Sequence, residues 1–295
     1  MRKNLKIIMD IKSILKQNNF TFEKRFGQNF LTDTNLLKSI VEKSGVNANS
    51  TVVEIGVGAG TLTGEIAKQV KKVYGFEIDT KLKPVLNETI KDYNNVEIIF
   101  SDILKIGAKK VDEMIGASYS IIANLPYYIT TPIIMEFVEK SEFCERVVVT
   151  VQKEVAERLV ASPKTSDYGA ITASIGAIAN SKIIKYIDRQ MFMPPPNVDS
   201  AVVRIEFDKN KFEILDIKEY RKLVKNAFSM RRKTLVNNLM KGYNLTRQEI
   251  ENALSNCNVP VSVRGEELGA ETYVELSNYL VKNGVKSKWL WNRKI

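Results

Sequence analysis

Residues 51–67 read TVVEIGVGAGTLTGEIA, an apolar, β-branched run that ends in a glycine-rich turn and continues into a helical pattern. Glycines at a strand end let the backbone turn tightly and approach a ligand closely. The N-terminus of the following helix favours polar or anionic groups at the same place. The spacing is G-x-G-x-G at Gly56, Gly58 and Gly60, with Thr61 where a dinucleotide fingerprint has its third glycine. Taken alone, this loop also fits a simple tight turn or a dinucleotide site.

Short β-rich runs alternate with helical patterns from residue 31 to residue 208. A first helix is predicted between Thr32 or Asp33 as N-cap and Gly45 as its end. Alternation of this kind indicates βαβ units and an α/β fold with a mostly parallel sheet covered on both faces. The predicted strands are 51–56, 72–79, 96–102, 118–125, 146–152, 182–189 and 200–207, the last two as an antiparallel pair.

After residue 208 the pattern contains helices only, over 219–240, 246–257 and 270–283. This change predicts a domain boundary near residue 208. The expected organisation is a basic N-terminal extension (1–20), a domain built on the sheet (21–208) and a smaller helical domain (209–295).

Histidine is absent from the 295 residues, and the two cysteines, Cys144 and Cys257, have no CxxC partner. Imidazole catalysis is therefore excluded, and neither a zinc site nor a disulfide framework is expected. No apolar segment approaches the ~18 residues that a membrane span requires. The basic N-terminus has no uninterrupted apolar core of the kind found in signal peptides. We therefore expect a cytoplasmic protein that binds neither metal nor membrane.

Positive charge is concentrated at the two ends of the sequence. Residues 1–30 carry 7 basic and 2 acidic side chains, and residues 209–295 carry 17 and 9, within a formal net charge of +10. Residues 31–208 are nearly balanced, with 20 basic and 23 acidic side chains. A modest excess can serve solubility alone, but two basic regions around a neutral middle favour a polyanion, most often nucleic acid.

Acidic side chains lie at or near the ends of the second and third predicted strands. Glu77, about 20 residues beyond the glycine loop, is placed to hydrogen-bond both hydroxyls of a ribose. Asp102 can accept a hydrogen bond from the exocyclic amine of an adenine. Each carboxylate alone could be solvated or cap a helix, but together they indicate a nucleoside lying across the sheet. Because no GxxxxGK[ST] loop occurs, a triphosphate is not expected.

The fourth predicted strand runs into ANLPYYIT at 123–130. A turn alone would require only Asn-Gly or Pro-Asp-Gly. An asparagine beside a rigid proline and two aromatic residues predicts a pocket for a flat group that donates hydrogen bonds.

These motifs and several others follow one another in the order seen in one family. They include Gly27–Leu31, Asn124–Tyr127, Phe192–Ser200 and Phe228–Leu235. Over roughly residues 20–265 the chain closely resembles the bacterial 16S rRNA adenine N6,N6-dimethyltransferases of the kasugamycin-resistance type. The resemblance implies a Rossmann-like class I S-adenosylmethionine-dependent methyltransferase domain with a seven-stranded sheet, followed by a smaller all-helical domain.

The resemblance also implies which residues bind the cofactor. Gly56 would contact the methionine part of S-adenosylmethionine, Glu77 its ribose and Asp102 its adenine. Asn124 would lie between cofactor and substrate. The full set of cofactor residues is Asn29, Leu31, Gly56, Gly58, Glu77, Asp102 and Asn124.

The expected chemistry starts from a poor nucleophile, because the lone pair of the adenine N6 is delocalised into the ring. The Asn124 side-chain oxygen and the Leu125 carbonyl would accept hydrogen bonds from the two N–H groups of this nitrogen, with Pro126 fixing the backbone. Positioning and electrostatics then suffice without a strong base. Tyr127 and Phe192 would stack on opposite faces of the target adenine.

Further residues are candidates for RNA contact. Arg231, Arg232 and Lys233 adjoin the start of a helical pattern, and their place in a basic domain favours an RNA-backbone clamp over a merely solvated face. Tyr128 could contact the substrate or only support the packing. Trp289 and Trp291 could stack on RNA or dock the C-terminal tail.

The preferred interpretation is a monomeric enzyme that dimethylates two adjacent adenines in a hairpin loop near the 3′ end of 16S rRNA, within an immature small ribosomal subunit. The alternatives are a 23S rRNA adenine methylase of macrolide resistance, a DNA adenine methylase and a non-catalytic assembly factor. Segments 192–200 and 228–235 favour the small-subunit family. No target-recognition insertion of a DNA methylase is evident.

Overall fold

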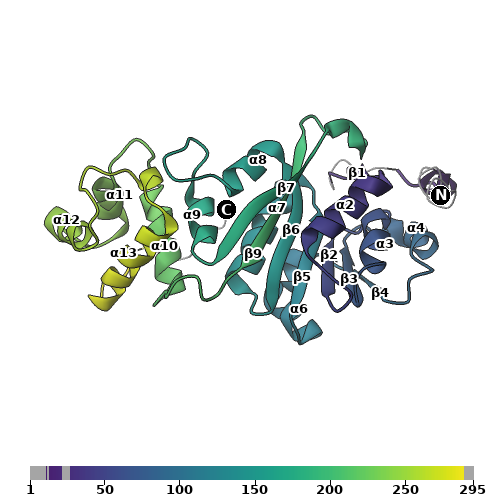
Figure 1. The fold of residues 1–295 in the computed structure, drawn as a ribbon, viewed down its shortest axis with the longest axis horizontal. Coiled ribbons are helices and arrows are strands. Elements are labelled where there is room, and N and C mark those ends of the chain that lie inside the picture. The colour runs from purple at the N-terminus through teal and green to yellow at the C-terminus, as the bar shows by residue number, and fades with distance from the viewer. Residues whose placement is uncertain (1–10, 12, 22–26, 289–295) are drawn as a thin grey trace. The chain divides into compact units, whose positions relative to one another are not determined.

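The computed structural model describes residues 11, 13–21 and 27–288. Most of the N-terminal extension and both Trp289 and Trp291 lie outside the described residues. The chain divides into two compact units, the first made of residues 1–156 and 182–207 and the second of residues 157–181 and 208–295 (Figure 1). Within the part of the chain that the structure describes, no helix combines the length and apolar character that crossing a membrane requires.

A seven-stranded sheet organises the first unit, in the strand order β4-β3-β2-β5-β6-β9-β7. The neighbours from β4 to β6 pair in parallel, and β9 pairs with β6 antiparallel. The predicted mostly parallel, seven-stranded sheet is therefore confirmed. The strands are β2 (Thr51–Ile55), β3 (Lys72–Glu77), β4 (Val96–Phe100), β5 (Tyr119–Asn124), β6 (Cys144–Gln152), β7 (Ala179–Ile187) and β9 (Ser200–Phe207).

The first long helix of this unit begins and ends at recognisable local signals. In α2 (Thr34–Ser44) the Asp33 side chain accepts a hydrogen bond from the Leu36 N–H at 2.7 Å, and Gly45 ends the helix at φ 82°. Both predicted limits of this helix are thus confirmed. The other helical segments are α3 (Thr61–Ala67), η2 (Thr80–Leu82), α4 (Lys83–Thr89), α5 (Ile103–Ile106), α6 (Ala108–Ile115), α7 (Tyr127–Lys140) and η3 (Arg189–Met191).

A two-stranded sheet was not predicted from the sequence. It joins β1 (Phe30–Leu31) to β8 (Phe192–Met193), with Phe30 opposite Met193 and Leu31 opposite Phe192. Strands of two residues show no periodicity, and their partners here lie about 160 residues apart, so no local pattern reveals them. This pairing brings two motifs from opposite ends of the first unit together.

The second unit has its own apolar core, formed by helices. They are α9 (Ala170–Gly176), α10 (Ile217–Ala227), α11 (Leu235–Gly242), α12 (Arg247–Asn256), η4 (Gly265–Glu267) and α13 (Ala270–Lys282), while α8 (Lys153–Leu159) spans the join between the units. The expected domain limits placed 157–181 with the sheet. In the structure this segment belongs to the helical unit, because Ala173 is buried against its core and its carbonyl accepts from the Tyr220 hydroxyl at 2.7 Å.

The prediction of a helix over 219–240 is wrong in one respect, because the structure has two helices there, with a break between Ala227 and Leu235. The Asn238 side chain donates to the carbonyls of Ala227 and Met230 at 2.7 and 3.1 Å, which stabilises the non-helical backbone there. The Thr234 hydroxyl then caps α11. A side chain that satisfies freed carbonyls outweighs the helical propensity of this stretch.

Candidate functional site

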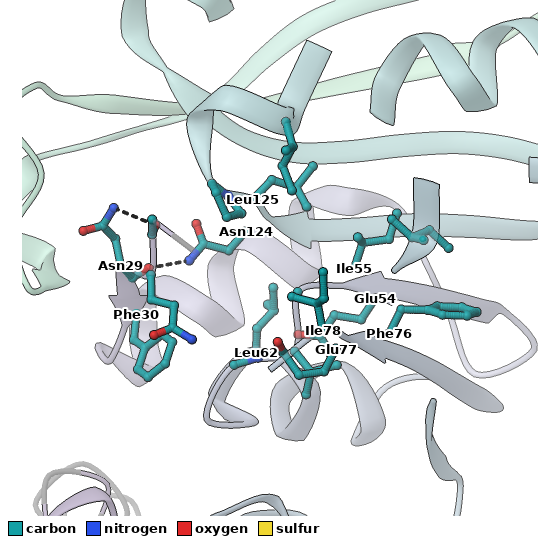
Figure 2. Close-up of a pocket in the computed structure, with 18 of the residues that line it drawn as sticks. Asn29, Phe30, Glu54, Ile55, Leu62, Phe76, Glu77, Ile78, Asn124 and Leu125 are labelled. Atoms are coloured by element: carbon teal, nitrogen blue, oxygen red, sulfur yellow. Dashed lines mark hydrogen bonds between the residues drawn. The ribbon is translucent and has the colours of Figure 1, made fainter. Parts of the chain in front are cut away.

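A cavity of about 260 Å³ opens at the carboxyl ends of β2, β3, β4 and β5 (Figure 2). It is lined by the residues that directly follow these strands, together with the segment 27–31 and Phe192. The cavity collects every residue expected to bind cofactor or to act in catalysis: Asn29, Leu31, Gly56, Gly58, Glu77, Asp102, Asn124, Leu125, Pro126, Tyr127 and Phe192. Arg231, Arg232 and Lys233 belong to the second unit.

The glycine loop has little room for a side chain at Gly58 and Gly60. Gly58 has φ 59°, and a Cβ there would lie 3.0 Å from the Phe30 ring. Its N–H donates to Glu77 Oε2 at 2.8 Å. The loop therefore presents backbone to the cavity and holds the carboxylate of the neighbouring strand.

Glu77 is buried, and backbone N–H groups orient both oxygens of its carboxylate. Oε2 accepts from Gly58, and Oε1 accepts from the N–H of Asp79 at 2.8 Å. Burial raises the pKa of Glu77 above its ordinary value, while these N–H groups partly offset the effect. Because each carboxylate oxygen can accept more than one hydrogen bond, both remain able to accept from ligand hydroxyls.

Asp102 has a structural role in addition to its place in the cavity. Its Oδ1 accepts from the Leu104 N–H at 3.0 Å and so caps α5. The helix-cap explanation weighed from the sequence is thus correct for one carboxylate oxygen. A carboxylate has a second oxygen, so the cap leaves Asp102 able to accept from another donor.

The Asn124 side chain bridges two walls of the cavity. Its Nδ2 donates to the Asn29 carbonyl at 2.9 Å, as Figure 2 shows. A carbonyl only accepts, so the amide nitrogen must face Asn29 and the amide oxygen Oδ1 is directed elsewhere. Asn29 is itself held by a bond from its side chain to the Gly27 carbonyl at 3.2 Å. This arrangement fixes an acceptor next to the Leu125 backbone.

Comparisons with known proteins identify the family. A family model described as ribosomal RNA adenine dimethylase matches residues 19–282. The chain belongs to this family. Relatives named ribosomal RNA small subunit methyltransferase A include one from Bacillus pumilus, 40% identical over 96% of this chain and 99% of its own length. Another, from Clostridioides difficile, is 40% identical over 94% of this chain and 96% of its own.

Solved structures agree with the fold of the dimethylase family. A dimethyladenosine transferase from Plasmodium falciparum has a TM-score of 0.74 at 24% identity, over 87% of this chain and 99% of its own. The 23S rRNA methyltransferase ErmE has a TM-score of 0.68 at 25% identity, over 86% and 100%. The predicted family and the Rossmann-like methyltransferase fold are confirmed.

Aromatic residues, among them Tyr127, Tyr128 and Phe192, line the cavity of this dimethylase. The Tyr127 hydroxyl lies 2.7 Å from the hydroxyl of the fully buried Ser200, and burial raises the pKa of Tyr127. Phe192 is 4% exposed and also belongs to the apolar core. Tyr128 is 63% exposed. Tyr127 and Phe192 are therefore fixed by their surroundings, whereas Tyr128 presents its ring largely to solvent.

Apolar residues of the cavity were missed by the sequence analysis. Ile78 follows Glu77 and is 51% exposed, and Leu104 lies two residues after Asp102 and is 39% exposed. Such exposure of a large aliphatic side chain at a cavity indicates a surface for an apolar ligand face. The sequence does contain a signal for them, because a large apolar residue follows each of the acidic residues Glu77 and Asp102 within two positions.

Glu54 of β2 was also missed. It lines the cavity but is buried, and its Oε2 has no hydrogen-bond partner among the described residues. Burial, reinforced by the charge of Glu77, raises the pKa of Glu54 to about 8. Within the described residues, no group of three or more His, Cys, Asp or Glu side chains could hold a metal ion.

Proposed function

We propose that the chain dimethylates the N6 amino groups of two adjacent adenines in a hairpin loop near the 3′ end of 16S rRNA, with S-adenosylmethionine as methyl donor. The observation that carries this proposal is the single cavity that joins Glu77, Asp102 and the Asn124–Tyr127 motif. Supporting evidence comes from the relatives at 40% identity, whose names refer to the small subunit.

The donor set of the cavity fits S-adenosylmethionine. The Glu77 carboxylate would accept the ribose hydroxyls, and Asp102 the amine of the cofactor adenine. Ile78 and Leu104 offer apolar surfaces for the faces of that base. Gly56 and Gly58 would admit the methionine part, while Asn29 and Leu31 close the site. When bound, the cofactor supplies a methyl group on a positively charged sulfur.

The residues of the Asn124–Tyr127 motif would position the target nitrogen. Asn124 Oδ1 and the Leu125 carbonyl would accept hydrogen bonds from its two N–H groups. The nitrogen is then held in place and pushed toward tetrahedral geometry, which localises its lone pair on the cofactor side. Pro126 restricts the backbone that carries the Leu125 carbonyl. Once methylated, the nitrogen is acidic and releases its proton to water, so no histidine is required. Tyr127 and Phe192 supply the stacking surfaces for the base.

The large-subunit alternative has a specific observation behind it, the similarity to ErmE over 86% of this chain. The higher identity to relatives named for the small subunit favours the 16S substrate. Action of a monomer on an immature subunit is part of the same proposal. The three expected RNA-binding residues Arg231, Arg232 and Lys233 are all exposed, and Arg231 is also paired with Glu266, which leaves Arg232 and Lys233 better suited to phosphate contact.

The test is transfer of labelled methyl groups from S-adenosylmethionine to unmethylated small subunits, with large-subunit RNA in parallel. We expect N6,N6-dimethyladenine in the small-subunit RNA only. Asn124→Ala should lower the rate of a single turnover by about 10²-fold or more, as for other lost oriented polar contacts. Asn35→Ala, which alters an exposed asparagine of α2, is the matched control and should leave the rate unchanged.

Label in the large-subunit RNA would place the chain with the 23S methylases. Tight binding of small subunits without any label would instead support the non-catalytic assembly factor. Equal rates for wild type and Asn124→Ala would refute the positioning role of Asn124.

A further inference from the structure

Arg231 makes three hydrogen bonds inside the second unit. Its Nε and Nη2 donate to Glu266 Oε2 at 3.1 and 3.0 Å, and Nη2 also donates to the Ser166 carbonyl at 2.7 Å. A guanidinium has donors in a fixed fork, and this fork reaches a carboxylate and a backbone carbonyl at once. Arg231 therefore connects the turn at Glu266 to the loop 162–168.

The same loop is tied to the same turn a second time. The Lys164 N–H donates to the Glu266 carbonyl at 2.8 Å. Lys164 has φ 70°, a left-handed backbone that a residue with a side chain adopts rarely and only when its surroundings hold it there. The hydrogen bonds from Arg231 and from the Lys164 N–H both end at Glu266, so they stabilise the same conformation of the loop.

Arg232 and Lys233 differ from Arg231 in this respect. All three side chains are exposed, but among the described residues the Arg232 guanidinium and the Lys233 ammonium group have no hydrogen bond or ion pair. They lie next to Arg231 in the chain. The Lys164 N–H and the Arg231 guanidinium both donate to Glu266, so the loop that carries the exposed Lys164 meets the segment that carries Arg232 and Lys233.

The charge of this surface depends on which acidic groups are paired with a cation. Glu266 forms an ion pair with Arg231. Glu267 accepts only from the neutral Arg264 N–H at 2.8 Å, so it keeps its negative charge, as does the exposed Asp167 of the loop. The cations on the hydrogen-bonded segments are Lys164, Arg232, Lys233, Lys241 and Arg264, all exposed. Positive charge thus exceeds negative charge, which suits a phosphate backbone.

We propose that Arg231 is a positioning residue, which holds Lys164 beside Arg232 and Lys233 so that these three cations contact RNA phosphates. This inference rests on the proposed function, and it assigns Arg231 a different task from its two neighbours. It also adds Lys164, from a segment about 65 residues earlier in the chain, to the RNA surface.

The positioning role is tested without RNA, by hydrogen exchange of the Lys164 amide. Arg231→Lys keeps the charge but cannot reach both acceptors with a rigid fork, so we expect protection of this amide to fall at least threefold. Arg232→Lys is the matched control, with the same chemical change one residue away, and should leave the protection unchanged. Equal protection in both variants and wild type would overturn the positioning role.

The RNA role is tested by binding to unmethylated small subunits at several salt concentrations. Lys164→Ala and Arg232→Ala should each reduce the slope of log K against log salt by about 0.7 to 0.9, the value for one lost phosphate contact. Arg231→Lys should raise the KM for RNA several-fold while kcat and S-adenosylmethionine affinity stay unchanged. In the Arg231→Lys background, Lys164→Ala should have little further effect, whereas Arg232→Ala should keep its full effect.

The outcomes separate the inference from the proposed function. Arg231→Lys could bind RNA like wild type while Arg231→Ala reduces the slope of log K against log salt by about one. In that case Arg231 is itself a phosphate ligand and the inference fails. If Lys164→Ala and Arg232→Ala leave RNA affinity unchanged but methyl transfer to 16S rRNA is intact, this surface does not bind the substrate, although the proposed function stands.

Discussion

At the scale of single residues, the buried acids Glu54 and Glu77 set how the first unit responds to pH. For Glu54 the pKa is near 4.5 in the unfolded chain and about 8 in the folded protein. Between these values the folded state keeps a proton that the unfolded state has released. The free energy of unfolding therefore falls as pH rises from about 4.5 to 8. Glu77, whose pKa is also raised, contributes in the same direction.

Glu54→Gln should remove the part of this pH dependence that is due to Glu54. The variant is expected to gain free energy of unfolding relative to wild type as pH rises from 5 to 8, by an amount on the order of 1 to 4 kcal/mol. Urea unfolding at the two pH values measures the difference. A wild-type pH profile in the variant would show that Glu54 is ionised in the folded protein over this range.

Gly58 offers a second residue-scale prediction, with Gly116 as its control. Both have positive φ, 59° and 65°, so alanine is strained at either position and should cost about 1 kcal/mol of stability. Only at Gly58 would the new Cβ meet a neighbour, the Phe30 ring at 3.0 Å, whereas nothing lies within 4 Å at Gly116. Isothermal titration with S-adenosylmethionine should show at least a tenfold affinity loss for Gly58→Ala alone. Equal losses in both variants would indicate a general effect of backbone strain.

At the scale of elements, one hydrogen bond links the start of α7 to the start of β9. Ser200→Ala removes the partner of the Tyr127 hydroxyl, so the ring loses a contact that fixes its orientation. A net loss of about 1 kcal/mol corresponds to roughly fivefold in kcat/KM for RNA. Tyr127→Phe should have a similar effect, and the double variant should be no worse than either single one.

Steady-state methylation assays with wild type, Ser200→Ala, Tyr127→Phe and the double variant form a double-mutant cycle, which measures the coupling between the two hydroxyl groups. Affinity for S-adenosylmethionine should stay within about twofold in all of them, because the hydroxyl pair is expected to act on the RNA base. Additive effects of the two substitutions would show that Ser200 and Tyr127 act independently.

Elements also show where local sequence signals were sufficient. The N-cap Asp33 and the terminal Gly45 predicted α2 correctly because capping depends on neighbouring backbone groups only. The helix expected over 219–240 is interrupted because Asn238 reaches back to carbonyls of residues 227 and 230. That interaction depends on how the chain folds back on itself, which periodicity does not report.

At the scale of the whole molecule, the sheet unit and the helical unit have separate cores and separate tasks in the proposed function. Raising salt from 50 to 200 mM should lower RNA affinity by at least tenfold if three or more phosphates are contacted. Affinity for S-adenosylmethionine should change less than twofold, since its expected contacts in the first unit are short-range hydrogen bonds and apolar packing. Parallel titrations measure both, and a salt-independent RNA affinity would contradict a phosphate-binding surface.

The sequence by itself determined the strands of the seven-stranded sheet, the glycine turn and the acids at the strand ends, because these follow from local periodicity and backbone conformation. It also placed Glu77, Asp102 and Asn124 together, since carboxyl ends of neighbouring parallel strands meet at one edge of a sheet. Only the tertiary structure decided the pairing of Leu31 with Phe192, the bond between Tyr127 and Ser200, and the attachment of residues 157–181 to the helical unit. It likewise revealed that Arg231 faces Glu266. Each of these contacts joins residues far apart in the chain, so its free energy depends on packing that no local pattern encodes.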